Sequence, residues 1–326
     1  IGVNWKDQAK KWNGLTAGYS DIAGTPPIAR TMLVLNNRVI MANLRTGANP
    51  SPVAVDWGNF NNFDAGWNGQ ATLLADTPGE IVIGEEMGNS TGALIKTDAA
   101  YRVIAQTGTV PFRFDYVPVP KDQGAAASLA YVRIGNSQIV YLALDGNLKT
   151  FDLNVVTDFG SDHARVHLQE TIDFTSIGRS WMAYDSTTGE ILIVYPIRGG
   201  SGEPDTGLII KRGGAIYPVK WGGRKFTAGT FARLSRPLTL ANLTVPFESI
   251  TKTFAELGLG DVLHQVLAAD STGQAFTFSG TTDNGTPIQF LFETGLNGLG
   301  TPTRLKTNSS IEHRTNRTAM SQPINV

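Results

Sequence analysis

The chain has 326 residues, of which 41% are hydrophobic and 17% charged, and its formal net charge is −1 at pH 7. A chain this close to neutral lacks the basic surplus that drives binding to nucleic acid or to an anionic membrane. The absence of cysteine excludes disulfides, iron–sulfur clusters and thiolate zinc sites, and no apolar run approaches the roughly 20 residues that span a bilayer.

Six pairs of apolar runs, each pair joined by a short polar turn, follow one another along the chain. The turns lie at Asn36-Asn37, Asp98, Asp145-Gly146, Asp185 to Gly189, Gly213-Gly214 and Asp270 to Gly273. Period-2 alternation around turn residues of this kind predicts β-hairpins. The 36 glycines and 16 prolines also favour many short strands over a helical bundle.

The hairpins recur at intervals that suit one architecture. The turns at 36, 98, 145, 212 and 270 lie 62, 47, 67 and 58 residues apart, and the turn at 185 precedes that at 212 by 27. Repeated β-units of about 40–60 residues indicate a β-propeller. A β-sandwich is the alternative, but it has no reason to repeat one hairpin. We predict an all-β fold, a β-propeller of about five to six blades with short helical insertions.

One hairpin nearly repeats in sequence. "AYDSTTGEILIVYP" at 183–196 matches "AADSTGQAFTFSG" at 268–280, and their aspartates, Asp185 and Asp270, are 85 residues apart. Since blades commonly take about 40–45 residues, this spacing predicts two blade hairpins separated by two blade lengths.

Two segments carry helical periodicity and are predicted as the insertions. Residues 161–174 have Asp162 as a candidate N-cap, and residues 247–268 have Gly258 as a C-terminal stop.

The division of the chain into domains follows from these predicted elements. Residues 1–295 are predicted to form the propeller, with the first ~30 as a lead-in or closing strand. Residues 296–326 are polar and predict a tail or the start of a further element. Because the first residue is Ile rather than Met, we expect a piece of a longer chain.

The sequence offers one candidate pair of metal ligands among its histidines, but a structural role explains these residues better. His163 and His167 stand four residues apart on one helical face, a spacing that can hold a metal. They lack the intervening Glu of a zinc protease, however, and His264 and His313 are distant in sequence. We interpret the pair as ordinary helix-surface histidines.

The acidic turns contain one carboxylate each, at Asp145, Asp185, Asp270 and Asp283. A calcium loop clusters several carboxylates within about twelve residues, so hydrogen bonds from each Asp to the backbone of its own turn are the better prediction.

Motifs for catalysis are also weak. Glu85 and Glu86 are adjacent, so on a strand they point to opposite faces. The glycine-rich stretch 198–207 lacks the context of a phosphate loop and predicts a surface loop, and no nucleophile elbow occurs. We therefore predict no catalytic, cofactor-binding or metal-binding residue, no cofactor and no enzymatic activity.

An aromatic loop at 56–69 offers a different kind of site. Its side chains include Trp57, Phe60, Phe63 and Trp67 among several asparagines. Carbohydrate-binding sites use aromatic faces and amide groups to contact sugars. The alternative is structural: the rings pack the loop onto the β-core. We favour packing, and we keep a glycan-binding or glycan-cleaving propeller as the alternative function.

The order of elements resembles a known group of proteins. "LVLNNRVIMANL" (33–44), "VAVDWGNFNNFDAG" (53–66) and the stretches 79–106 and 112–152 run like the β-propeller tail proteins of short-tailed bacteriophages. The likeness continues through 165–196 and ends near "IQFLFETGLNGLGTPTRLK" (288–306). It covers about residues 31 to 306 and rests on the pattern and order of elements.

The resemblance implies a structural virion protein located in the tail, as a subunit of the nozzle or hub. It implies a ring-shaped homo-oligomer, typically a hexamer, that contacts other tail proteins such as the adaptor and fibres. Double-stranded DNA would pass through it transiently during ejection. The near-neutral charge of −1 fits a conduit that does not grip phosphates.

A second resemblance concerns the turns alone. Asp-x-x-Thr-Gly turns also occur in quinoprotein propellers, where a tryptophan after the glycine docks neighbouring blades. Here the two turns run on into Ile-Leu-Ile and Ala-Phe-Thr, and the vicinal cysteines often found at that cofactor are absent. A quinone-dependent oxidoreductase is therefore the weakest of the three hypotheses.

Overall fold

The computed structural model describes residues 1–12, 15, 18–46, 49–67, 72–88, 90–108, 110–211, 214–221, 223–235, 262–277, 282–283 and 286–287. The chain divides into two compact units, Ile1–Ser279 and Gly280–Val326. In the second unit the described residues form a small antiparallel pair, β22 (Thr282–Asp283) with β23 (Thr286–Pro287). The predicted polar tail, 296–326, lies outside the described residues.

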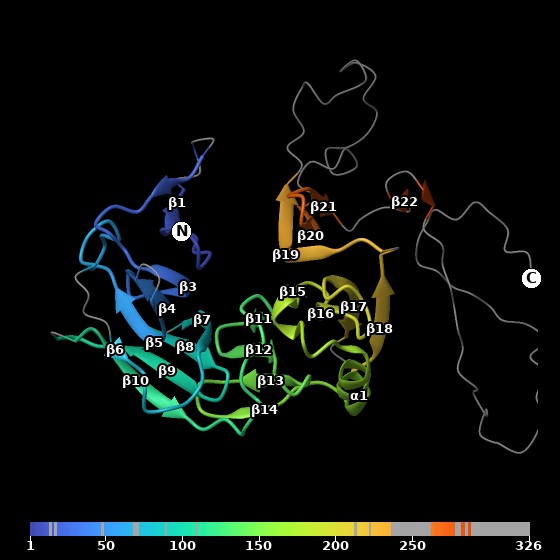
Figure 1. Cartoon of the computed structure of the whole chain (residues 1–326), viewed down its shortest axis with the longest axis horizontal. Coiled ribbons are helices and arrows are strands. Elements are labelled where there is room, and N and C mark those ends of the chain that lie inside the picture. The colour runs from blue at the N-terminus through green and yellow to red at the C-terminus, as the bar shows by residue number, and fades with distance from the viewer. Residues whose placement is uncertain are drawn as a thin grey trace, which may run out of the picture. The chain divides into compact units, whose positions relative to one another are not determined.

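Four four-stranded antiparallel sheets make up most of the first unit, each a meander of consecutive strands (Figure 1). Blade 1 contains β3 (Ile28–Leu35), β4 (Arg38–Thr46), β5 (Asn49–Trp57) and β6 (Thr72–Leu73). Blade 2 contains β7 (Ile81–Gly88), β8 (Thr91–Lys96), β9 (Ala100–Ala105) and β10 (Phe112–Val117). Blade 3 contains β11 (Tyr131–Ile134), β12 (Gln138–Leu142), β13 (Leu148–Phe151) and β14 (Val156–Asp158). Blade 4 contains β15 (Trp181–Asp185), β16 (Glu190–Pro196), β17 (Pro204–Ile210) and β18 (Ile216–Lys220).

A fifth sheet follows, with three strands among the described residues: β19 (Phe226–Ser235), β20 (Val262–Asp270) and β21 (Ala275–Thr277). The first strands of successive sheets lie beside one another, β3 by β7, β7 by β11, β11 by β15 and β15 by β19. These strands begin at residues 28, 81, 131, 181 and 226, so that the repeat is 53, 50, 50 and 45 residues long. Meander sheets that stack through their first strands are propeller blades. The predicted all-β propeller is confirmed.

Hydrophobic side chains fill the space between neighbouring blades. Leu33, Val55 and Trp57 of blade 1 pack with Leu94 and Tyr101 of blade 2, and the next three interfaces hold equivalent clusters. Blades 2, 3 and 4 therefore bury both of their faces, and each Å² of apolar surface removed from water contributes about 25 cal/mol to stability.

The free face of blade 1 is covered by the N-terminal segment. β1 (Lys10–Lys11) pairs with β2 (Ser20–Asp21), and the flanking Ala9 and Ile22 are fully buried against Val39 and Met41 of blade 1. The first residues thus extend the packing of the propeller beyond its first sheet.

The first predicted helix is present as α1 (Asp162–Thr171), which joins blade 3 to blade 4. Its N-cap is Ser161 rather than Asp162, because the Ser161 hydroxyl accepts a hydrogen bond from the Ala164 N–H at 3.4 Å. Leu168 is buried in the cluster between the two blades. A short 3₁₀ helix, η1 (Ile177–Arg179), follows. Among the described residues no helix is long and apolar enough to cross a membrane.

The second predicted helix is wrong at its C-terminal end. Residues 262–268 belong to β20, which pairs with β19 on one side and β21 on the other. Pairing on both edges outweighs a local helical pattern, because such preferences are weak against tertiary context. Residues 247–261, with Gly258, lie outside the described residues.

The predicted hairpin turns are confirmed where the structure describes them. The predicted separation of two blades between the similar turns at Asp185 and Asp270 is wrong. Asn36 and Asn37 both have positive φ, 48° and 55°, as the two-residue turn between β3 and β4 requires. The turn at Asp185 joins the first and second strands of blade 4, whereas the turn at Asp270 joins the second and third strands of the next sheet. They are therefore one blade apart, in different positions, because Asx-turn chemistry suits any tight turn of a meander.

Candidate functional site

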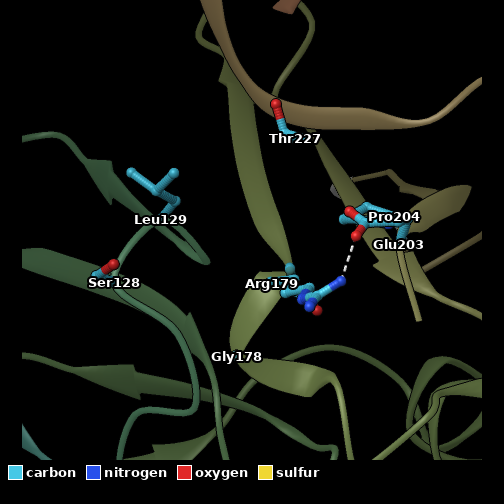
Figure 2. A pocket seen from close by; sticks show the side chains of 8 residues that line it. Ser128, Leu129, Gly178, Arg179, Glu203, Pro204 and Thr227 are labelled. Atoms are coloured by element: carbon cyan, nitrogen blue, oxygen red, sulfur yellow. Dashed lines mark hydrogen bonds and ion pairs between the residues drawn. The ribbon is translucent and has the colours of Figure 1, made fainter. Parts of the chain in front are cut away.

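A pocket with a volume of about 320 Å³ opens where the connections between blades meet (Figure 2). Ser128 and Leu129 come from the segment that leads into β11, and Gly178 to Ser180 from the segment that leads into β15. Pro204 is the first residue of β17 and Glu203 directly precedes it, while Thr227 comes from β19. This volume is at the lower end of the range for small-molecule sites, about 300–1,000 Å³.

An ion pair stands at the rim of the pocket. The guanidinium of Arg179 pairs with the carboxylate of Glu203 and also donates to the Gly202 carbonyl at 3.2 Å (Figure 2). Both side chains reach solvent, being 56% and 32% exposed. Because the pair is this exposed, solvent screening makes its contribution to stability small. Its effect on the pocket is to cancel most of the local charge.

One of the residues that line the pocket, Ser180, has a buried hydroxyl without a partner. Ser180 is 1% exposed, and its Oγ makes no hydrogen bond. Two other buried polar side-chain atoms among the described residues share this condition, Asn43 Oδ1 and Arg102 Nε, but neither belongs to a residue that lines the pocket. Leaving a buried hydroxyl unpaired costs about 1–3 kcal/mol, so this atom is unusual.

A second polar cluster joins the first strands of blades 2 and 3. The Tyr131 hydroxyl donates to Glu85 Oε2 at 2.8 Å, and Arg133 donates to the Glu86 carbonyl at 2.8 Å. Burial raises the pKa of Glu85 above its usual value and also raises the pKa of Tyr131. Glu85 is half-buried and Glu86 exposed, so the two point apart as predicted. The cluster fastens two blades together and leaves no carboxylate pair for acid–base chemistry.

A buried lysine serves the packing of blade 2. Lys96 is fully buried, and its ammonium donates to the carbonyls of Leu74 at 3.0 Å and Thr77 at 2.6 Å and to the Thr77 hydroxyl at 2.9 Å. Burial lowers the pKa of Lys96. Three good acceptors satisfy the three donors of a charged ammonium, and the group therefore caps the segment between blades 1 and 2.

Three of the four acidic turns contain the predicted hydrogen bonds between the aspartate side chain and the backbone of its own turn. Asp185 Oδ1 accepts from the Thr187 N–H at 2.7 Å, and Asp145 Oδ1 accepts from the Asn147 N–H at 2.9 Å. In the same way Asp270 Oδ1 accepts from the N–H groups of Thr272 at 2.9 Å and Gln274 at 3.0 Å. The fourth of these residues, Asp283, ends β22.

The two histidines of α1, His163 and His167, have different surroundings. His167 Nε2 lies 3.2 Å from the Tyr195 hydroxyl, while His163 is exposed. No group of three or more His, Asp or Glu side chains is arranged to hold a metal within the described residues. His264 lies on β20, far from this pair in sequence, and His313 is outside the described part of the chain.

The aromatic loop divides into buried tryptophans and exposed phenylalanines. Trp57 packs edge-on against Phe112 with ring centroids 5.6 Å apart, and the Trp67 indole donates to the Phe63 carbonyl at 2.8 Å. Both tryptophans are buried, so the predicted packing onto the core holds for them. Phe60 and Phe63 remain exposed.

The chain has structural likenesses to known proteins but no detectable relatives in sequence. No family model matches the chain, and no curated protein matches it in sequence. Among solved structures it is similar to virginiamycin B lyase from Staphylococcus aureus, with 9% identity, a TM-score of 0.40, and coverage of 81% of this chain and 73% of that one. It is also similar to BBS1N, solved in complex with ARL6DN, with 8% identity, a TM-score of 0.42, and coverage of 82% and 71%. Likenesses this distant carry no inference about function.

The pocket was not predicted from the sequence. Residues 198–207 were predicted to form a surface loop, whereas residues 204–207 are the start of β17, and Glu203 and Pro204 line the cavity. Arg179 and Ser180 belong to no motif. The one available signal was Pro204, since the first residue of a strand is one of the few places in a sheet where proline is found.

Proposed function

We propose that this chain is a structural virion protein, a propeller subunit of the tail nozzle or hub of a short-tailed bacteriophage. The observation that carries the proposal is the order of elements over residues 31–306, which resembles that of such proteins. Copies of the chain assemble into a ring, typically of six, that contacts adaptor and fibre proteins and gives DNA a passage at the distal end of the tail.

The distribution of charge supports a passive conduit. Several cationic side chains on the blades are engaged by nearby carboxylates, as in the pairs of Arg102 with Asp115 at 2.9 Å and Lys211 with Glu190 at 3.1 Å. DNA binding scales with the number of phosphates that free Lys and Arg neutralise. Cations paired in this way hold DNA weakly, and a duplex can slide past them.

The rigidity of the blades supports an architectural role. Each interface between blades carries a buried apolar cluster, and the Glu85–Tyr131 hydrogen bond joins blades 2 and 3 directly. A subunit that keeps its shape presents fixed loops to its neighbours, which is what assembly into a closed ring requires.

The test is assembly. Purified chain, alone and mixed with the adaptor and fibre proteins encoded beside it, is examined by analytical ultracentrifugation and negative-stain electron microscopy. The proposal expects rings with about six times the 35.0 kDa mass of one chain, and no retention of duplex DNA on a gel at physiological salt. Monomers under every condition, in a chain whose gene has no portal or tail genes nearby, would overturn it.

A glycan-binding or glycan-cleaving propeller remains the alternative. Its support is the aromatic loop, where the exposed rings are Phe60 and Phe63. Arg38 lies 5.8 Å from the ring centroid of Phe60, and Lys11 lies 5.8 Å from that of Phe63. A depolymerisation assay on bacterial surface polysaccharides decides it, with a Phe60→Ala, Phe63→Ala double variant as the control because these two rings are outside the core. Activity lost in that variant would favour the alternative.

A further inference from the structure

We infer that the outer edge of β10, in blade 2, pairs with β10 of a second copy of this chain, antiparallel and in a single register centred on Phe114. This inference goes beyond the proposed function and does not rest on it. Two observations carry it: the backbone groups that β10 leaves unpaired at its edge, and a side-chain sequence that is complementary to itself.

The outer strand of blade 2 is better suited to pairing than those of the other blades. Among the described residues β10 pairs with β9 alone (Figure 1). It has six residues and contains no proline, whereas β6 and β14 have two and three residues and β18 contains Pro218. A strand edge of this kind presents a row of N–H and C=O groups with which another chain can pair.

The hydrogen bonds to β9 show which backbone groups are left at this edge. The Gln106 N–H donates to the carbonyl of Pro111 at 2.8 Å, and the register of β9 and β10 places these two residues directly opposite each other. In an antiparallel pair, positions bonded in this way alternate with positions whose groups point the other way. The N–H and C=O groups of Phe112, Phe114 and Tyr116 therefore point outward.

A twofold axis at Phe114 uses all of these outward groups. Phe114 then lies opposite the partner's Phe114, and Phe112 lies opposite the partner's Tyr116. Each such pair exchanges hydrogen bonds in both directions, because these are the hydrogen-bonded positions of the new antiparallel pair. The row ends at Pro118, which has no N–H to donate.

The side chains of β10 match one another in this register. One face carries only aromatic side chains at the paired positions, and on the other face Arg113 lies directly opposite the partner's Asp115. Aromatic pairs and opposite charges directly across a sheet are favourable, whereas like charges there are unfavourable. A shift of two residues in one direction places Arg113 opposite itself, and a shift in the other places Asp115 opposite itself. The charges therefore select the register centred on Phe114.

The charged side chains are placed to reach a second copy. Arg113 is 52% exposed, and its Nε donates to Asp115 Oδ1 at 2.9 Å within the chain. Arg102 also donates to Asp115, at 2.9 Å. Two guanidinium groups thus share one carboxylate, so Arg113 can turn to the partner's Asp115 while Arg102 continues to hold Asp115 in place.

The contact is isologous and closes with two copies, which separates it from the contact that would close a ring. A chain that forms no ring is expected to dimerise through β10. If rings form, the same contact joins one ring to another, and its loss leaves each ring intact. Failure of this inference and failure of the proposed function are therefore distinguishable.

The test measures self-association of the full chain by sedimentation equilibrium. The parent is expected to reach twice the 35.0 kDa mass of one chain, with a Kd of about 10–100 µM because the interface is small. Arg113→Glu and Asp115→Lys each place like charges opposite one another, and each is expected to weaken self-association about tenfold. An equal mixture of these two variants is expected to associate nearly as tightly as the parent, because every carboxylate at the two positions then faces a cation on the other chain.

A backbone variant and a matched control complete the test. Tyr116→Pro removes an outward N–H without changing charge, and it is expected to weaken association at least fivefold, since two hydrogen bonds are lost in each dimer. Arg165→Glu makes the same charge change as Arg113→Glu at an exposed residue of α1, and it is expected to associate as the parent does. Circular dichroism melting checks that each variant is folded.

Three results would overturn the inference. The first is a parent chain, or a parent ring, that stays unpaired at about ten times the highest expected Kd. The second is a Kd that is the same in the parent, Arg113→Glu and Tyr116→Pro. The third is a mixture of folded Arg113→Glu and Asp115→Lys that associates no more tightly than either variant alone. If Asp115→Lys does not fold, the comparison of the parent with Arg113→Glu and Tyr116→Pro decides.

Discussion

Trp181 offers the sharpest test of how the blades are joined. Its side chain is fully buried at the interface between blade 4 and the β19 sheet, and its indole N–H donates to the Phe226 carbonyl at 2.7 Å. The ring lies directly over the backbone of Gly229, where a Cβ would overlap it. One residue thus supplies packing, a hydrogen bond and a close approach between two sheets.

The expected cost of Trp181→Phe has two parts. The Phe226 carbonyl loses its side-chain donor in a buried place, which costs about 1–3 kcal/mol. The smaller ring leaves roughly 40 Å³ empty, which adds about 1 kcal/mol at 24 cal/mol per Å³. We expect a loss of about 2–4 kcal/mol in the free energy of unfolding, measured by urea denaturation with circular dichroism.

The matched control is Trp12→Phe. Trp12 is 53% exposed and packs against Tyr19 at a centroid distance of 6.2 Å, so its substitution is expected to change stability by less than about 0.5 kcal/mol. The reasoning is refuted if the two variants lose the same amount. It is also tested by Gly229→Ala, which we expect to be strongly destabilising in the parent and less so beside Trp181→Phe, because the smaller ring relieves the overlap.

Three further predictions follow from single contacts. Burial raises the pKa of Glu85 above its usual 4.5, so the folded protein binds more protons than the unfolded one just above that pH. The free energy of unfolding therefore falls as pH rises through this window, and Glu85→Gln should flatten that fall in pH-dependent urea titrations; an unchanged slope contradicts it. Ser161→Ala should lose about 1 kcal/mol of helix capping and speed amide exchange at Ala164, and unaltered exchange would count against the cap. Asn37→Val should cost about 1–2 kcal/mol of thermal stability because φ is 55° there, whereas Asn37→Gly should cost little; equal losses would exclude the backbone as the cause.

The strands and turns were predictable because their causes are local. Asn36-Asn37 and Asp145-Gly146 carry residues that tolerate positive φ, and the flanking apolar runs alternate with a period of two. The position of a turn within its sheet was not predictable from the same signal. Asp185 and Asp270 make similar hydrogen bonds at different steps of their meanders, since nothing in an Asx turn records which strands it joins.

The pocket was out of reach for a different reason. Its residues come from segments that are about 25 to 50 positions apart, and they meet only because the first strands of successive blades lie side by side. That Ser180 has no partner is a property of the packed molecule, since serine is commonly exposed. The strand at 262–268 was missed on similar grounds, because its two pairing partners are non-local or lie beyond a turn.

Trp181 is adjacent to the pocket in the structure, so substitutions at Trp181 and at Ser180 are expected to have different effects. Ser180 directly precedes Trp181, and Thr227 directly follows Phe226, whose carbonyl accepts the indole hydrogen bond. Two walls of the cavity are therefore held in place by one buried side chain. Trp181→Phe should loosen the walls and lower stability together, whereas Ser180→Ala removes an unpaired hydroxyl and should leave stability equal or slightly higher. The two variants therefore test different things: Trp181→Phe tests the interface between blade 4 and the β19 sheet, and Ser180→Ala tests whether the unpaired hydroxyl costs stability.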